Sequence, residues 1–308
     1  MLEVHTLGAW AAVAVPLALA VVAGIAATAD AVTGAVLAGR RPRTGVLSPL
    51  RRTVGLLLTQ RRSTSVPDSL LWRFGGGGVL VVACVATVVV PLGAWSAADL
   101  SVGVVWWSGF IAVLWVLLHM IGYSANAGFP LVGGYRFLAQ AMAYEMPMAI
   151  SIICAALAAH SLRVGAVVSA QHGLWFAVWM PAAFVIFLIC GLAASFYGPF
   201  STPTSPALGG GLLAELSGID RLVVLAGRYL VLASVAGFGT AMFLGGGAGP
   251  LLPAPVWTLL KTAAVLTVLI GARWRWPQIR TERFEEIGWV VLLPLSVLQA
   301  LIVSLVVL

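Results

Sequence analysis

A short polar stretch, GGYRFLAQAMAYEMPMA at residues 133–149, stands out in an otherwise apolar sequence. It places Arg136, Gln140, Tyr144 and Glu145 within ten residues. A charged side chain at the centre of a lipid bilayer costs about 3 kcal/mol on insertion scales. Ionisable groups in such a stretch are therefore expected to lie between helices, where they can hold a proton, an ion pair or a polar ligand.

Two other charges occupy comparable apolar surroundings. Arg228 lies six residues into an apolar run, as Glu145 does, so both would sit about 9 Å into the membrane at 1.5 Å per residue. Arg136 precedes Glu145 by nine residues, which places it on the opposite face of a helix. The sequence therefore predicts that Glu145 pairs with Arg228 or with another polar site between helices. Asp30 is either a member of such a site or a residue at a helix boundary.

Eight long apolar runs carry these residues. The chain has 308 residues, of which 61% are hydrophobic and 9% charged, and its mean hydropathy is +1.05. A run of about 20 apolar residues is long enough to cross the bilayer as a helix. We therefore predict an all-α polytopic membrane protein with about eight transmembrane helices in a single integral membrane domain, residues 1–308. The runs are 8–37, 77–98, 102–121, 139–159, 174–194, 222–245, 256–271 and 288–308.

The basic residues lie mainly in alternate connections between these runs. Fourteen of the 17 basic residues fall in the odd-numbered connections. An excess of Lys and Arg in short loops marks the cytoplasmic side. This pattern predicts both termini on the non-cytoplasmic side of a multi-pass protein of the cell inner (plasma) membrane. The expected cytoplasmic loops are about 38–76, 122–138, 195–221 and 272–287.

The first of these loops contains GVLSPLRRTVGLLLTQRR, which reads as a short amphipathic helix with Val54, Leu57 and Leu58 on its apolar side. Such a helix lies at the membrane interface. Its arginines are explained either by contact with the anionic lipid bilayer or by docking of soluble subunits. The pattern shows no nucleic-acid recognition fold, so no nucleic-acid partner is expected.

No catalytic or metal-binding motif stands alone in the chain. The histidines lack metal-ligand spacing, and the cysteines lie singly in apolar runs, as buried hydrophobic residues do. We therefore expect no catalytic residues and no metal site in this chain by itself. The histidines are His5, His119, His160 and His172, and the cysteines are Cys84, Cys154 and Cys190.

Two stretches resemble a known family, the membrane subunit that forms the quinone chamber of complex I, or NADH-quinone oxidoreductase (the H subunit in bacteria, subunit 1 in mitochondria). The first is GGYRFLAQAMAYEMP, and the second is VWTLLKTAAVLTVLIGARWRWPQIRTERFEEIGWVVLLPLSV, residues 256–297. GVLSPL at 45–50 and AELSG at 214–218 are shorter matches. With the loop asymmetry, the resemblance covers nearly the whole chain.

The resemblance implies a membrane subunit of a respiratory electron-transport complex, a proton-translocating translocase whose quinone substrate is shared with partner subunits. No cofactor would be bound by this chain alone. Other membrane subunits, soluble iron–sulfur subunits, quinone and lipid are the implied partners. The implied quinone chamber and coupling path comprises Asp30, Arg136, Glu145, Tyr197, Phe200, Glu215 and Arg228. The implied docking face for the soluble iron–sulfur arm comprises Arg273, Arg280 and Arg283.

The chain departs from the family where the family is rich in acids. In LAASFYGPFSTPTSPALGGG the family's acids and arginine are replaced, and Arg228 stands where the family has Glu. A relay of titratable groups cannot work unchanged with these replacements, so the departures predict weakened or absent proton coupling. Two alternatives stay open, the membrane anchor of an energy-converting nickel–iron hydrogenase (formate hydrogenlyase-like) module and a non-redox paralogue. The replaced positions are Ala194, Tyr197, Ser201, Thr204 and Pro206.

Overall fold

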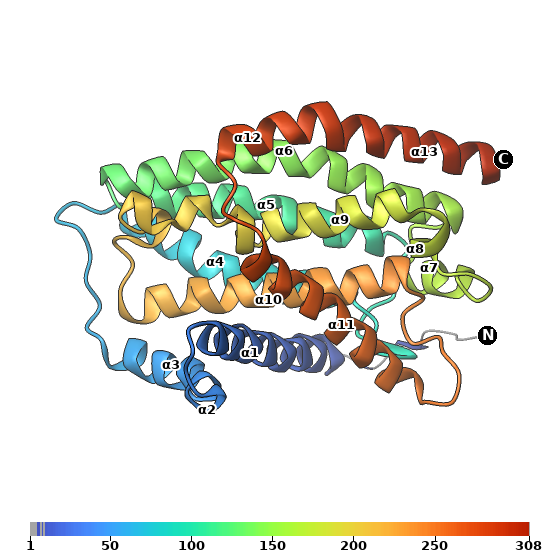
Figure 1. Ribbon diagram of the computed structural model, residues 1–308, viewed down its shortest axis with the longest axis horizontal. Coiled ribbons are helices and arrows are strands. Elements are labelled where there is room, and N and C mark those ends of the chain that lie inside the picture. The colour runs from blue at the N-terminus through green and yellow to red at the C-terminus, as the bar shows by residue number, and fades with distance from the viewer. Residues whose placement is uncertain (1–4, 7, 9, 308) are drawn as a thin grey trace.

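The computed structural model is a bundle of long helices that run side by side (Figure 1). It describes residues 5–6, 8 and 10–307, so Leu308 at the end of the eighth expected run lies outside the described residues. Within this part of the chain, seven helical segments are long and apolar enough to cross a membrane. They are α1 (Ala11–Leu37), α4 (Ser69–Thr87), α5 (Gly103–Ser124), α6 (Gly128–Ala158), α10 (Gly218–Phe243), α11 (Ala254–Arg275) and the segment Thr281–Val307.

The last segment consists of three successive pieces, and shorter elements connect the long helices. The pieces are α12 (Thr281–Ile287), the π-helical turn η5 (Gly288–Leu292) and α13 (Leu293–Val307). The shorter helices are α2 (Pro42–Val46), α3 (Ser48–Leu58), α7 (Val164–Ala170), α8 (Phe176–Trp179) and α9 (Pro181–Ala194). Four 3₁₀ turns follow α9, namely η1 (Gly198–Phe200), η2 (Thr202–Thr204), η3 (Pro206–Leu208) and η4 (Gly211–Leu213), and the strands β1 (His5–Thr6) and β2 (Trp95–Ser96) pair in parallel.

The predicted all-α membrane fold is confirmed, but the fifth expected run forms a shorter helix than the others. The run 174–194 breaks between α8 and α9 at Met180, whose ψ of 58° is not helical. Pro181 causes this break, because the residue before a proline is disfavoured in the helical conformation. The remaining α9 has 14 residues, about 21 Å of helix, which is less than the hydrocarbon thickness of about 30 Å.

The third connection also differs from the expectation of a loop at 122–138. Helix α5 ends at Ser124 and α6 begins at Gly128, so only three residues separate the two helices. Arg136 therefore lies inside α6 and not in a loop. The glycine pair at 133–134 makes this stretch look like a turn in the sequence. Gly133 instead allows close packing, because a Cβ there would lie 2.5 Å from the backbone nitrogen of Leu212.

Helix α10 is the most buried of the long helices and organises the bundle around it. Small residues permit its close contacts, as is common in membrane helices. A Cβ at Gly227 would lie 2.8 Å from Val79 of α4, so this position requires glycine for the observed packing. On the outside, Leu17, Val21 and Ile25 of α1 remain more than 60% exposed, as lipid-facing side chains do.

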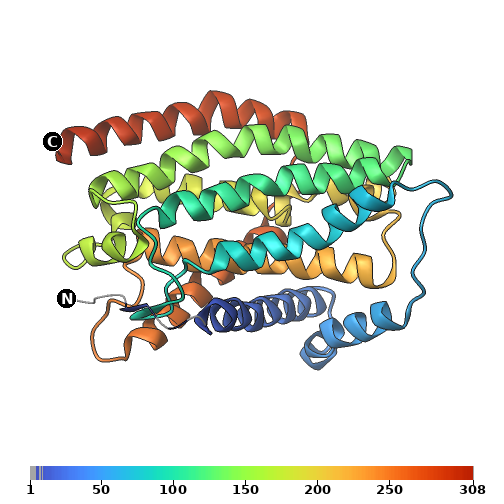
Figure 2. The ribbon, with the colours of Figure 1, turned by 180° about the vertical axis from the view of Figure 1, so that it is seen from behind.

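Both the first turns of α1 and the last turns of α13 lie at one end of the bundle (Figures 1 and 2). Helices α2 and α3 and the connection after them lie at the other end. The arginine-rich connections contact one another there. The backbone N–H of Arg62 donates to Ser217, and the N–H of Ile279 donates to the carbonyl of Pro199. One end of the bundle is therefore formed by the basic connections.

Candidate functional site

Asp30 is the centre of a polar cluster built from three helices. It lies on α1 and is 5% exposed. Its Oδ2 accepts hydrogen bonds from the Tyr229 hydroxyl at 2.8 Å and from the Arg273 guanidinium at 2.5 Å. Its Oδ1 accepts a hydrogen bond from the Trp274 indole at 3.0 Å. The carboxylate is therefore an internal group with three donors, and the boundary interpretation of Asp30 is wrong.

The local sequence explains how α11 reaches α1. Arg273 and Trp274 lie in the last turn of α11, where basic residues are favoured by the helix dipole. One turn after Asp30, Gly34 leaves room for the indole of Trp274, since a Cβ at Gly34 would lie 2.6 Å from that ring. Gly34 thus allows Trp274 to cross α1 and reach Asp30.

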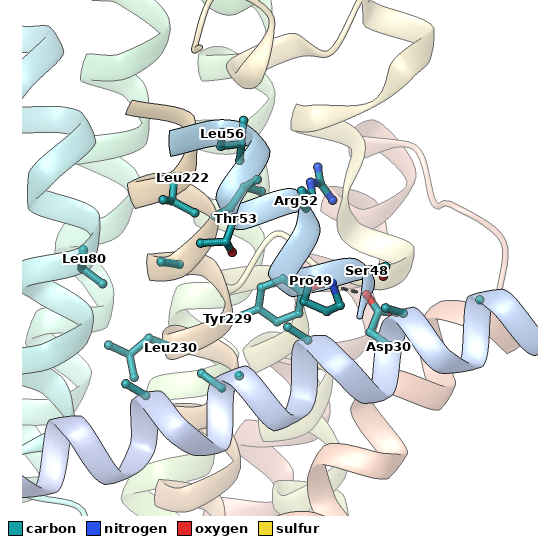
Figure 3. Close-up of a pocket in the computed structure, with 18 of the residues that line it drawn as sticks. Asp30, Ser48, Pro49, Arg52, Thr53, Leu56, Leu80, Leu222, Tyr229 and Leu230 are labelled. Carbon is teal, nitrogen blue, oxygen red and sulfur yellow. Dashed lines mark hydrogen bonds between the residues drawn. The ribbon is translucent and has the colours of Figure 1, made fainter. Parts of the chain in front are cut away.

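A cavity of about 450 Å³ opens beside this cluster, between α1, α3, α10 and the end of α11 (Figure 3). Its polar lining residues are Asp30, Ser48, Arg52, Thr53, Tyr229 and Arg273. Its apolar walls include Ala23, Ala27, Leu222, Leu225 and Leu230. Figure 3 shows Tyr229 and Pro49 beside the Asp30 carboxylate, with Leu80, Leu222 and Leu230 further along. The cavity therefore has a polar end and an apolar end, which suits a ligand with a polar head and an apolar tail.

Arg228 lies next to this cluster but is bonded differently. It is 9% exposed, and its guanidinium carbon lies 5.1 Å from the ring centroids of both Phe196 and Tyr197. Among the described residues its Nε has no hydrogen-bond partner. The side chain is thus a buried cation held between aromatic faces, an attraction worth about 2 kcal/mol when desolvated.

Tyr197 connects the two arginines. The guanidinium of Arg273 lies 5.3 Å from its ring centroid, and the ring of Tyr229 lies 5.9 Å away in an edge-on arrangement. Burial raises the pKa of Tyr197 well above its usual range, and the Asp30 charge adds to this effect. Tyr197 therefore stays a neutral phenol at physiological pH.

The predicted pair between Glu145 and Arg228 is wrong. Glu145 is half-buried on α6, and it forms no hydrogen bond or ion pair with any described residue. Equal depth in the membrane does not fix which way a side chain points. Arg228 turns towards the aromatic pair after α9, so the acid nearest to its cluster is Asp30.

The remaining expected chamber residues are spread over the same end of the bundle. Phe200 is buried and packs against Phe284, with ring centroids 4.5 Å apart, which attaches η1 to α12. Glu215 is half-buried just before α10. Neither Phe200 nor Tyr197 lines the cavity beside Asp30. The structure thus brings Asp30, Tyr197 and Arg228 together and leaves Arg136, Glu145, Phe200 and Glu215 outside that cluster.

A second hollow of about 800 Å³ lies between α6, the 3₁₀ turns and α12. Arg136, Arg280 and Arg283 all line it, together with Glu282 and Glu286. Arg283 donates to Glu286 one turn later. Arg273, which was expected on this surface, points into the Asp30 cluster instead, because it belongs to the last turn of α11. We call this hollow the arginine groove.

Sequence reasoning missed Trp274 and Arg52, which complete the site. Trp274 follows Arg273 directly at the end of an apolar run, and an indole N–H at such a place is a usable signal, since it needs an acceptor when buried. Arg52 could be recognised only once α3 was known to cover the cavity. Among the described residues, no group of three or more His, Cys, Asp or Glu residues gathers to hold a metal ion.

The fold and the site define a class, the multi-span helical membrane proteins with a polar cluster and a ligand-sized cavity at one end of the bundle. A family model described as NADH dehydrogenase matches residues 8–304. The chain therefore belongs to the NADH dehydrogenase family of complex I membrane subunits, which comprises the bacterial H subunit and mitochondrial subunit 1. The resemblance found in the sequence is thereby confirmed.

Curated relatives, all of them H subunits of NADH-quinone oxidoreductases, agree with this assignment. The chain is 33% identical over 269 residues to the second such H subunit of Geobacter sulfurreducens, covering 84% of this chain and 82% of that protein. It is 36% identical over 209 residues to the second H subunit of Cereibacter sphaeroides, covering 67% and 66% respectively. It is 31% identical over 265 residues to the second H subunit of Rhodopseudomonas palustris, covering 85% and 83%.

Proposed function

We propose that this chain is a membrane subunit of an NADH-quinone oxidoreductase in the plasma membrane of its cell, and that it binds quinone in the cavity beside Asp30. The observation that carries this proposal is the lining of that cavity, which is polar at one end and apolar at the other. A quinone needs hydrogen-bond donors for its carbonyl oxygens and apolar walls for its isoprenoid tail. Arg273 and Arg52 supply donors, and the alanines of α1 with the leucines of α10 supply the walls.

The residues of this chain would bind and orient the quinone, while partner subunits would supply the electrons. Asp30 holds Tyr229 and Arg273 in fixed positions through its hydrogen bonds. A quinone carbonyl that gains negative charge on reduction would be stabilised by the preorganised guanidinium of Arg273. The chain is accordingly one part of an assembled enzyme, with the reaction completed by soluble iron–sulfur subunits.

A steric block tests the cavity directly. Ala27 lines the cavity, and Ala29 lies two residues away on the exposed side of the same helix. Ala27→Trp should raise the KM for quinone in the purified complex by about tenfold, because an indole would fill part of the tail site. Ala29→Trp adds the same side chain on the outer face and should change the KM less than twofold. Equal effects of the two substitutions, or none from Ala27→Trp, would contradict the assignment.

We propose that the arginine groove receives the soluble iron–sulfur subunits. Arg136, Arg280 and Arg283 converge there from two different helices. Charged groups of this kind select a partner of complementary charge more than they add affinity. Reversing Arg280 and Arg283 to Glu should remove the soluble subunits from the purified complex, while Arg163→Glu, at the other end of the bundle, should retain them. If nickel–iron hydrogenase subunits copurify instead of an NADH-oxidising module, the electron donor is hydrogenase-linked and not NADH.

We infer that proton coupling in this subunit is weak. Two of the acids expected along an internal path are poorly placed to pass on a proton. Asp30 accepts hydrogen bonds from the Arg273 guanidinium and the Tyr229 phenol, and Glu145 has no described partner. Arg228 adds a fixed positive charge to the same region, which opposes the approach of a proton. Proteoliposomes holding the complex should therefore show a lower ratio of protons moved to NADH oxidised than a complex with the family's acids. An undiminished ratio would overturn this inference.

A further inference from the structure

The connection between α1 and α4 carries an unusual concentration of one charge. We call residues 40–62, which include α2 and α3, the arginine arm. It contains seven arginines, all exposed, and the sequence has no Asp or Glu between Asp30 and Asp68. They are Arg40, Arg41, Arg43, Arg51, Arg52, Arg61 and Arg62.

Almost none of this charge is neutralised inside the protein. Arg61 donates to Asp220 at 2.7 Å, and Asp220 also accepts a hydrogen bond from Trp72 at 2.8 Å. The other six arginines form no ion pair with any residue that the structure describes. The end of the arm is thus fastened to α10, and the rest of it presents free positive charge.

Helix α3 has two distinct faces. Pro49, Arg52, Thr53 and Leu56 lie on one side and line the cavity, as Figure 3 shows for these four residues. The other side carries Arg51 and five apolar residues that are unpartnered within the described chain and 46–80% exposed. They are Leu47, Leu50, Val54, Leu57 and Leu58.

We propose that the arginine arm binds the surface of anionic phospholipids, with its arginines other than Arg52 and Arg61 on the lipid phosphates and the apolar side of α3 inserted at the boundary of headgroups and acyl chains. Two observations favour lipid over an acidic protein. Arg51 and Arg52 share the same short helix with exposed apolar side chains, as in interfacial amphipathic helices. The arm also lies beside the end of α1 (Figure 2), where Val36 and Leu37 are 52% and 62% exposed.

The position of α3 has a consequence for the cavity. Because the helix covers the cavity with one face and meets the membrane surface with the other, lipid charge holds this cover in place. The arm is therefore a lipid-dependent wall of the site. This proposal does not require the cavity to bind quinone, so it can fail or succeed independently of the proposed function.

Hydrogen exchange of the full chain in nanodiscs tests the proposal. Amides of α3 should be at least about tenfold better protected in discs with roughly 30% phosphatidylglycerol than in pure phosphatidylcholine, because each arginine near an anionic surface shifts such an equilibrium about fivefold. Raising the salt concentration to about 1 M, where the screening length is about 3 Å, should abolish the difference. Amides of the buried α10 should exchange equally in all discs, which reports an intact fold.

Matched triple variants separate the arm from the overall charge of the protein. Arg41→Gln, Arg43→Gln and Arg51→Gln together should remove the effect of phosphatidylglycerol on α3. Arg275→Gln, Arg280→Gln and Arg283→Gln remove the same charge from α11 and its connection to α12, and should leave that effect intact. Equal protection of α3 in the two kinds of disc would overturn the proposal. Protection that appears only when soluble subunits are added, whatever the lipid, would overturn it in favour of a protein partner.

Discussion

Helix α11 carries a cation near each of its ends, and the two cations differ both in burial and in bonding. Lys261, near the start of the helix, is 5% exposed and donates to the carbonyls of Leu244, Gly246 and Ala248 at 2.6, 3.0 and 2.7 Å. The indole faces of Trp175 and Trp257 enclose its ammonium group. Arg273, about 18 Å further along the helix, shares Asp30 with Tyr229 and Trp274 beside an open cavity.

The difference teaches how to separate a structural polar group from a functional one. All three ammonium hydrogens of Lys261 have acceptors, and these carbonyls follow the C-terminal end of α10, where a cation is favoured. Around Arg273, by contrast, polar groups border a cavity, and the neighbouring Arg228 Nε has no described partner. Fully satisfied groups fix the fold. A cation that borders a cavity, as Arg273 does, is available for a ligand.

The largest expected effect is on stability at the Lys261 end. Lys261→Met should lower the free energy of unfolding by about 3 kcal/mol, because three buried carbonyls lose their donor. Unfolding in mixed detergent micelles measures this change. Thr267→Val, on the exposed side of the same helix, should change it by less than about 0.5 kcal/mol. A small effect of Lys261→Met would show that the three carbonyls find other donors.

The second effect is on activity at the Asp30 end. Asp30→Asn keeps the shape of the side chain but removes the charge that holds Arg273. It should lower kcat/KM for quinone by about tenfold, equivalent to about 1.4 kcal/mol, with little loss of assembled complex. Asp99→Asn, an acid at the opposite end of the bundle, serves as the control and should leave kcat/KM unchanged. If Asp30→Asn lowers assembly and not kcat/KM, the cluster is structural, as at Lys261.

A third prediction compares Lys261 with Arg228, which is also a buried cation. Arg228→Met should change the free energy of unfolding by less than about 1 kcal/mol, because the loss of the aromatic contacts is offset by the removal of an unpaired buried charge. The same unfolding measurement as for Lys261→Met applies. A loss as large as that predicted for Lys261 would mean that Arg228 has an acceptor that its geometry does not reveal.

The smallest effect concerns pH. The pKa of Tyr197 is raised in the folded state, so the stability linked to its protonated form is fully present below about pH 10, the pKa in the unfolded chain, and is lost as the pH rises further. The unfolding free energy of the wild type should therefore fall relative to that of Tyr197→Phe between about pH 10 and 11. A constant difference would mean that Tyr197 ionises as it does in the unfolded chain.

Much of the fold could be predicted because the membrane imposes long apolar helices. The arginine asymmetry grouped the basic connections correctly, since those at 61–62, 217–220 and 278–279 contact α10 or the 3₁₀ turns at one end. The break before Pro181 was missed, because the apolar composition continues through it. The short connection at 125–127 was missed because glycines within α6 look like a loop.

The site could be predicted only in part, because the sequence gives the depth of a side chain in the membrane but not the direction in which it points from its helix. Arg228 was recognised as a buried charge and Asp30 as a candidate for one, yet their partners depend on helix rotation. Arg273 was assigned to a docking surface because it ends a helix among other arginines. Its bond to Asp30 requires Gly34 to admit Trp274, a contact between residues 240 positions apart that no local pattern reveals.

The central claim is that the ligand of this protein binds beside Asp30. The most direct measurement is photolabelling of the assembled complex with a quinone that carries a photoreactive group on its tail, followed by peptide mapping. Labelling is expected on α1 between residues 20 and 34 and on α10 near Leu225, and excess unmodified quinone should displace it. Displaceable labelling confined to the Lys261 end of the bundle or to the arginine groove, with none on α1, would contradict the claim.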